Sequence, residues 1–280
     1  MNLGPLEFTA SLFGIALTAG FMGALTGTGG GVIITPALTL LFGVDLRYAI
    51  GASLVSVIAT SSGAASAYVR EGYTNIRIGM FLEVATTFGA VLGAFLAARV
   101  PTSVLAVIFG VVLLHSAWMS VRPPEESGDA ASSDPIARRL GLNGSYPTPD
   151  GAKPYHVRNA GGGFGLMFGA GAMSGLLGIG SGALKVIAMD RVMRIPFKVS
   201  TTTSNFMIGV TAAASAGVYL HRGYIDPVLA MPVMTGVLAG SLIGARILAG
   251  ASVKTLRILF GILVAAIGVQ MIVSGLRGTI

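Results

Sequence analysis

The stretch Gly27-Thr28-Gly29-Gly30-Gly31 lies inside an apolar run that extends from residue 8 to residue 43. A second stretch, Gly178-Ile179-Gly180-Ser181-Gly182, interrupts the apolar run 160–193 in the same manner. One crossing of the hydrocarbon core of a bilayer takes about 20 apolar residues, and both runs exceed that length. The sequence therefore favours, in each run, a helical hairpin that enters the membrane, breaks at the glycines and leaves on the same side.

Six further apolar runs have the length of a single span. They are 49–69, 77–99, 102–121, 199–220, 226–248 and 255–275. Of the 280 residues, 53% are hydrophobic and 10% are charged, whereas a soluble domain carries about 25% charged residues. We therefore expect an all-α polytopic membrane protein.

The composition also excludes several classes of function. The chain has no cysteine, which excludes disulfides, thiolate metal sites and a cysteine nucleophile. The net charge of +7 is spread between the apolar runs rather than gathered in one patch, which argues against nucleic acid as a partner. No GxxxxGK[ST] motif and no catalytic constellation occurs, so we expect neither enzyme activity nor a cofactor nor a bound metal.

Residues 122–159 differ sharply in composition from their surroundings. They contain six prolines and many serine, glycine and charged residues, and a segment with so few apolar side chains does not bury a core of its own. We expect a cytoplasmic, largely disordered linker between a first transmembrane repeat, 1–121, and a second, 160–280.

The two halves match each other without a gap when the sequence is shifted by 151 residues. The shift aligns the glycine stretches and pairs Gly72-Tyr73 with Gly223-Tyr224. Between 19–97 and its shifted copy, 18 of 79 positions are identical. We interpret this as an internal duplication.

The basic residues indicate how the halves are oriented. If both glycine-broken runs are hairpins, 13 of the 18 Lys and Arg residues fall on one side of the membrane, as expected for cytoplasmic loops. Lys185 lies in the second hairpin, and the residues on the other side are Arg47, Arg99, Arg222 and Arg277. We predict two inverted repeats, each a glycine-broken hairpin plus three transmembrane helices, with both termini outside. This arrangement is typical of secondary transporters.

The glycine stretches are the first candidates for ligand binding. Successive glycine amides followed by a helix N-terminus form a concavity that binds anions, and two such clusters facing each other would hold one small anion near the membrane centre. The alternative is that the glycines only allow close helix packing, which we favour for one cluster but not for a matched pair. The candidate substrate-binding residues are Gly27, Gly29, Gly30, Gly31, Gly178, Gly180, Ser181 and Gly182.

Polar residues in the helices that follow the glycine stretches add further candidates. Ser53 and Ser204 correspond under the 151-residue shift, and Asn205 places a primary amide in an apolar helix. Hydrogen bonds within or between membrane helices explain most such residues, but we predict that these three supplement the anion site.

Charge inside an apolar run is costly and therefore marks functional candidates, of which we single out Glu83 and Lys185. Glu83 would serve either in proton coupling or as the structural partner of a base such as Lys185 or Arg246. Lys185 would either attract the anion or pair with Asp190, with the second slightly favoured.

The motifs resemble those of a known family. The pattern Gly23-Ala-Leu-Thr-Gly27-Thr-Gly-Gly-Gly31-Val-Ile-Ile-Thr-Pro36-Ala-Leu38 resembles the first-repeat motif of the sulfite exporter TauE/SafE family. Gly171-Ala-Met-Ser-Gly175-Leu-Leu-Gly-Ile-Gly-Ser-Gly182 is similar to the second motif of that family, with Ile187 standing where the first half has Pro36. The resemblance covers roughly 10–121 and 160–275.

The resemblance implies a transporter of small sulfur-containing anions in the bacterial inner membrane, such as sulfite or an organosulfonate like sulfoacetate, usually moving outward. An uptake permease and a passive anion channel remain the alternatives. The oligomeric state stays open, a homo-oligomer included, because the stripes Gly89-xxx-Gly93 and Gly240-xxx-Gly244 suit packing within or between protomers.

Overall fold

The computed structural model describes residues 4–26, 29–70, 72–121, 134–148, 151–247 and 253–280. The long helices are α1 (Pro5–Thr26), α3 (Leu46–Arg70), α4 (Ile76–Ala97), α5 (Thr102–Val121), α7 (Ala160–Leu177), α9 (Phe197–His221), α10 (Pro227–Ile247) and α11 (Val253–Arg277). The shorter elements are α2 (Gly31–Phe42), α6 (Pro135–Arg139), β1 (Gly144–Thr148), β2 (Gly151–Tyr155), α8 (Gly182–Ile187) and the π-helix η1 (Ala188–Val192).

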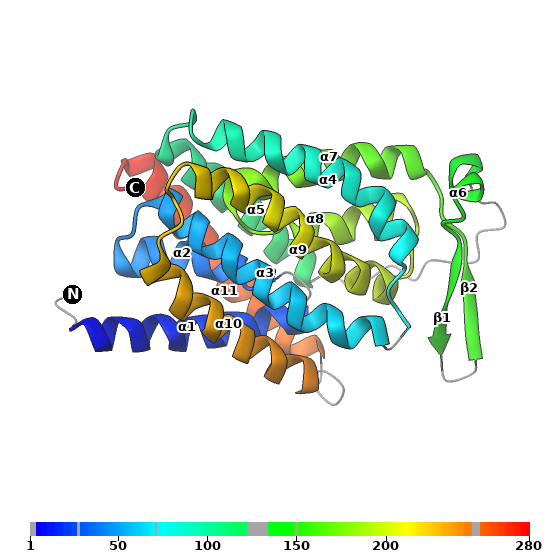
Figure 1. Cartoon of the computed structure of the whole chain (residues 1–280), viewed down its shortest axis with the longest axis horizontal. Helices are drawn as coiled ribbons and strands as arrows, with labels where there is room; N and C mark the ends of the chain where they lie inside the picture. Colours follow the sequence, from blue (N-terminus) through cyan, green and yellow to red (C-terminus); the bar gives the residue numbers. More distant parts are fainter. Residues whose placement is uncertain (1–3, 27–28, 71, 122–133, 149–150, 248–252) are drawn as a thin grey trace.

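The helices run along the longest axis of the molecule, and their boundaries match the predicted apolar runs (Figure 1). Five of them, α1, α4, α5, α7 and α10, are long and apolar enough within the described residues to cross a membrane. The all-α, multi-pass membrane class is thereby confirmed. Helices α3 and α9 carry the hydroxyl-rich stretches, and they pack against each other.

Both long apolar runs break at their glycines. Helix α1 ends before the first cluster and α2 begins at Gly31, while α7 ends at Gly178 in a left-handed C-cap with φ of 67°. The two second arms differ in form, because α2 is one continuous helix whereas α8 passes into η1. The sequence predicted that the arms differ in shape because Ile187 stands where the first half has Pro36, but the continuous helix is the one that contains the proline.

Small residues allow the long helices to approach backbone to backbone. A Cβ atom at Gly89 of α4 would lie 2.1 Å from the carbonyl oxygen of Phe168 in α7. At the corresponding position in the second half, a Cβ at Gly240 of α10 would lie 2.0 Å from the carbonyl oxygen of Leu17 in α1. Only glycine fits such contacts, so both glycine stripes are used inside the protomer.

The linker corrects one expectation. Residues 134–148 and 151–159 are not disordered: they form α6 and the antiparallel β1–β2 hairpin. Leu142, Tyr155 and Val157 are buried in a cluster that includes Ile78 of α4 and Met193. The few apolar side chains of the linker thus use the end of the helix bundle as their core, which composition alone does not reveal.

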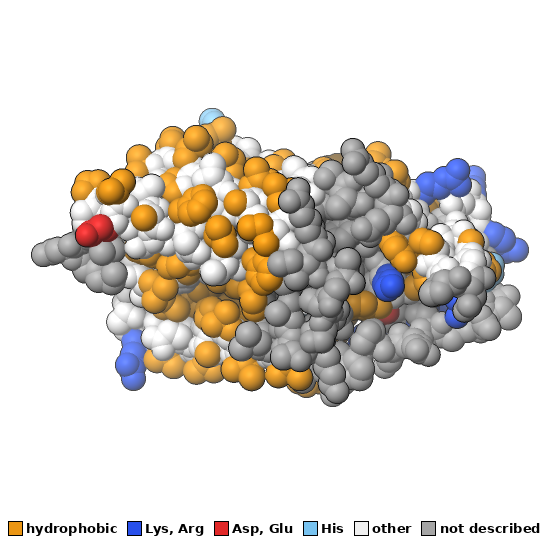
Figure 2. Space-filling view, turned by 90° about the horizontal axis from the view of Figure 1, so that it is seen from below, with side chains coloured by type: hydrophobic (Ala, Val, Ile, Leu, Met, Phe, Trp, Pro, Cys, Tyr) orange, Lys and Arg blue, Asp and Glu red, His pale blue; other side chains and the backbone are white. Residues whose placement is uncertain are grey.

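The two ends of the molecule differ in charge. Both described termini lie at the end opposite to the β1–β2 hairpin (Figure 1). On the face shown in Figure 2, most of the Lys and Arg side chains lie toward the hairpin end, whereas hydrophobic side chains predominate over the described part of the opposite half. A surface with apolar sides and basic residues at one end suits a protein that spans a bilayer.

Candidate functional site

The two glycine clusters meet around two side chains, Val57 of α3 and Ile208 of α9. Gly29 and Gly180 both have left-handed backbone conformations, with φ of 67° and 69°. A Cβ at Gly180 would lie 2.8 Å from Ile208 Cγ2 and 2.9 Å from Val57 Cγ1, and one at Gly29 would lie 3.6 Å and 3.8 Å from the same atoms. The breaks therefore share their neighbours, and Gly180 fits both in space and in conformation only because it lacks a side chain.

Two serines hold the broken backbones in place. Ser53 Oγ donates to the carbonyl oxygen of Gly178 at 2.8 Å and lies 3.3 Å from that of Gly31, so it connects the two clusters. Ser204 Oγ donates to the carbonyl oxygen of Gly182 at 3.2 Å. Both hydroxyl protons thus point at carbonyl groups, and a role of these serines as anion ligands stays a prediction.

Each cluster leads directly into a helix N-terminus. Gly30 is the N-cap of α2, and Ser181, with φ of 48°, is the N-cap of α8. The first amides of a helix have no intrahelical partner and carry a partial positive charge. Of the predicted glycines, Gly27 lies outside the described residues.

Two predicted residues present buried hydrogen-bond donors that are not used. Within the described residues, neither Ser181 Oγ nor Asn205 Nδ2 has a hydrogen-bond partner, although the two residues are only 2% and 4% exposed. The backbone carbonyl of Asn205 accepts a hydrogen bond from Ser61 Oγ at 2.6 Å. Leaving a donor unpaired in a protein interior costs about 1–3 kcal/mol, so each is suited to a bound acceptor.

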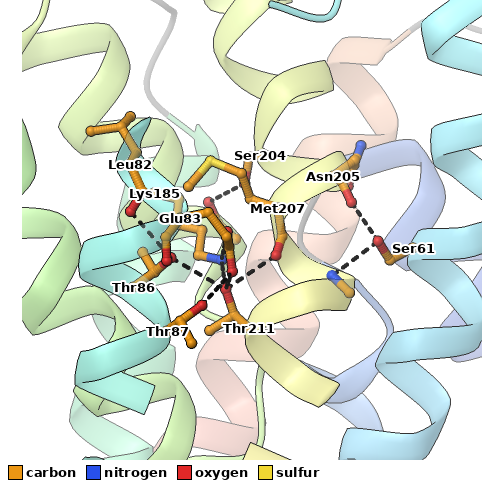
Figure 3. A network of polar contacts seen from close by, with 12 residues as sticks. Ser61, Leu82, Glu83, Thr86, Thr87, Lys185, Ser204, Asn205, Met207 and Thr211 are labelled. Atoms are coloured by element: carbon orange, nitrogen blue, oxygen red, sulfur yellow. Dashed lines mark hydrogen bonds and ion pairs between the residues drawn. The ribbon is translucent and has the colours of Figure 1, made fainter. Parts of the chain in front are cut away.

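Glu83 and Lys185 lie next to each other in a polar network between α4, α8 and α9 (Figure 3). Lys185 Nζ is 4.0 Å from Glu83 Oε2. The hydroxyl of Thr211 bridges the pair, since it accepts from Lys185 Nζ at 2.5 Å and donates to Glu83 Oε1 at 2.6 Å. The hydroxyl of Thr87 donates to the same oxygen at 3.2 Å.

The sequence analysis named Lys185 as one possible partner of Glu83, and the two side chains lie together. For Lys185 itself the sequence slightly favoured Asp190 as the partner. The contacts of Val57 and Ile208 were also missed, although the two positions correspond under the 151-residue shift and follow Ser53 and Ser204 by four residues. No group of three or more His, Asp or Glu side chains lies together in the described part of the chain, so we assign no metal ligands there.

Comparison with known proteins places these motifs in a family. The family model described as "Sulfite exporter TauE/SafE" matches residues 12–271. The probable membrane transporter protein YunE of Bacillus subtilis is 28% identical over 272 residues, which cover 94% of this chain and 96% of YunE. The probable membrane transporter protein YdhB of the same organism is 26% identical over 84% of this chain and 86% of its own length. No solved structure gives a significant match.

Proposed function

The chain belongs to the sulfite exporter TauE/SafE family, and from this premise we propose that it exports sulfite or a small organosulfonate such as sulfoacetate across the bacterial inner membrane. In this proposal the protein is a secondary transporter. The anion binds between the two glycine-broken hairpins, and the two repeats alternate its access to the two sides.

The observation that carries the proposal is the meeting of the two glycine clusters at Val57 and Ile208. The N-termini of α2 and α8 begin at these clusters, and helix N-termini favour negative charge. The donors Ser181 Oγ and Asn205 Nδ2, which have no partner in the described part of the chain, can form hydrogen bonds of the kind that sulfonate and sulfite oxygens accept. These features together support an oxyanion as the substrate.

Corresponding contacts in the two halves support a structural duplication, and the position of the termini supports its inversion. Helix α4 packs on α7, and α10 packs on α1, which is the same contact after the 151-residue shift. The pair Ser53 and Gly31 likewise corresponds to Ser204 and Gly182. The termini lie opposite to the basic hairpin end (Figure 1), which supports a cytoplasmic linker and external termini.

Two other functions use the same site. An uptake permease for a sulfonate, for sulfate or for another small anion differs only in direction. A passive anion channel would use the glycine breaks as a constriction. In proteoliposomes loaded with unlabelled sulfite, a transporter accelerates the entry of labelled sulfite by counterflow, whereas a channel shows no such stimulation.

The first test is direct binding of sulfite, sulfoacetate, taurine, sulfate and chloride to the detergent-purified protein. We expect selective binding of a sulfur oxyanion that is lost in Gly29→Leu and Gly180→Leu. The control is Gly217→Leu, because a Cβ at Gly217 of α9 meets nothing within 4 Å. If both cluster variants bind like the wild type, the anion site does not lie between the glycine clusters.

A further inference from the structure

Glu83 of the first repeat and Lys185 of the second form a charge pair that the internal duplication does not repeat. Under the 151-residue shift, Lys185 corresponds to Ile34 and Glu83 corresponds to Met234. Their bridging residue Thr211 corresponds to Thr60, so the polar hydroxyl is repeated but the two charges are not. The duplicated architecture therefore does not by itself require this charge pair, which points to a functional role for it.

The ammonium group of Lys185 lies close to the proposed anion site. Lys185 follows the start of α8 at Gly182 by three residues, and its side chain reaches Thr211. Thr211 follows Ile208 by three residues, or about 4.5 Å along α9, and Ile208 contacts both glycine clusters. The positive charge thus lies about one helical turn from the place where the clusters meet.

Charge balance links this pair to the anion. Lys185 is fully buried and Glu83 is 8% exposed, and together they are neutral. An anion that enters this interior adds an uncompensated charge, which is costly in a medium of low polarity. Lys185 supplies a counter-charge to the anion only if Glu83 loses its own charge.

We propose that anion binding is coupled to protonation of Glu83, so that Lys185 exchanges the carboxylate for the anion and one proton binds with each monovalent anion. This coupling rests on the proposed anion transport. The proton comes from hydronium in the accessible water, forms an O–H bond on the Glu83 carboxylate and leaves a water molecule. No bond of the anion breaks, and no electron is transferred.

The contacts of Glu83 indicate where the proton binds. Oε1 accepts hydrogen bonds from Thr211 and Thr87, whereas Oε2 has no hydrogen-bond partner within the described residues and faces Lys185. We assign the proton to Oε2.

Few other ionisable residues lie on the elements around this pair; η1, which directly follows α8, carries Asp190 and Arg191. Helix α7, which packs against α4, contains no ionisable residue. The ionisable residues of α9, namely Lys198, Tyr219 and His221, lie in its terminal turns. On α8, Lys185 is the ionisable residue.

The experiment measures proton uptake when the purified full-length protein binds an anion in weakly buffered detergent solution. The probes are sulfite and isethionate, a C2 sulfonate whose charge does not change over the pH range used. We expect about one proton to be taken up per isethionate bound. In the pH range where Glu83 of the free protein is ionised, the anion affinity should fall about tenfold for each unit by which the pH rises.

Three variants separate coupling from folding. Glu83→Gln should bind the anion at all pH values without proton uptake, and Lys185→Met should lose anion binding. Thermal melts of the two single variants show whether each of them folds, and the neutral double variant Glu83→Gln/Lys185→Met is the reference in which both charges are removed together. Glu7→Gln, at an exposed carboxylate near the N-terminus, should behave like the wild type.

The outcomes distinguish this inference from the proposed function. Anion binding by the wild type without proton uptake and with pH-independent affinity overturns the coupling and leaves the transporter proposal intact. Failure of the wild type to bind sulfite or isethionate at any pH overturns both. Proton uptake that persists in Glu83→Gln shows that another group takes the proton, and overturns the assignment to Glu83.

Discussion

At the scale of single residues, the candidate site combines satisfied carbonyl groups with unsatisfied donors. Ser53 and Ser204 direct their hydroxyls to the carbonyl groups of the glycine clusters, while Asn205 Nδ2 and Ser181 Oγ remain without a partner within the described residues. The sequence identified all four as candidates from their place after or within the glycine stretches. It did not reveal which of these donors already form hydrogen bonds within the protein, because that depends on the geometry of the breaks.

Asn205→Leu tests the unsatisfied donor. Leucine is the residue that the first half carries at the corresponding position, Leu54. Removing a buried donor that has no partner among the described residues should leave the stability unchanged or raise it by about 1 kcal/mol, while anion affinity falls at least about tenfold. Thermal melts and anion titration of the purified variant measure the two effects. A loss of stability with unchanged affinity would assign Asn205 to the fold.

At the scale of elements, the glycines fall into two groups with different functions. In the breaks, Gly29, Gly178 and Gly180 adopt positive φ, whereas glycines of α4, α7 and α10 allow carbonyl groups of neighbouring helices to come close. The sequence predicted the breaks and the helix boundaries from run length. It left open whether the stripes pack within the protomer, because small-residue spacing is the same for either interface.

A pair of glycines in α7 tests the packing group. A Cβ at Gly171 would lie 2.1 Å from the carbonyl oxygen of Thr86, whereas one at Gly169 meets nothing within 4 Å. We expect Gly171→Ala to separate α7 from α4 and to cost about 1–3 kcal/mol. Gly169→Ala should be neutral or slightly stabilising, because alanine favours helix. Equal thermal stability of the two variants would contradict the close approach of α4 and α7.

The folded part of the linker is a second element that can be tested. Asn75 caps α4 with its side-chain oxygen and donates through Nδ2 to Tyr155 Oη at 2.6 Å. Burial raises the pKa of Tyr155 above its ordinary value, with the hydrogen bond from Asn75 opposing the shift. The unfolded segment therefore loses this proton first, so docking is fully stabilised below pH of about 10 and weakens as the pH rises further.

Limited proteolysis of the linker as a function of pH measures this docking. We expect cleavage to accelerate above pH of about 10 in the wild type. Tyr155→Phe should remove this alkaline dependence and weaken docking by about 1 kcal/mol at neutral pH, because the hydrogen bond is lost. Tyr146→Phe on the same hairpin is the matched control. An unchanged alkaline dependence in Tyr155→Phe would assign it to another group.

At the scale of the whole molecule, the orientation in the membrane depends on the distribution of basic residues. Arg77 lies at the hairpin end, where its Nη1 contacts the carbonyl oxygen of Gly141. Arg47 and Arg222 lie together at the other end, where they contact carbonyl groups of Val100 and Ala94. The sequence sorted these residues onto two sides from the hairpin hypothesis, but it did not predict the folded linker.

Single cysteines test the orientation, and the natural chain provides a background without cysteine. Lys153→Cys on β2 should react with a membrane-impermeant maleimide only when the cytoplasmic side is accessible. Glu7→Cys near the N-terminus should react in intact cells. Labelling of both from the same side would contradict external termini with a cytoplasmic linker.

The packing of helices from the first half on helices from the second half determines when the chain can complete its fold during synthesis. Helix α1 packs on α10, and some 200 residues separate the end of α1 at Thr26 from the start of α10 at Pro227. At about 5–20 residues per second, the ribosome takes roughly 10 to 40 seconds to deliver that partner. During this interval the face of the nascent α1 that later packs on α10 lies against lipid or against the insertion machinery. The first half therefore reaches its final packing only when the second half has been synthesised.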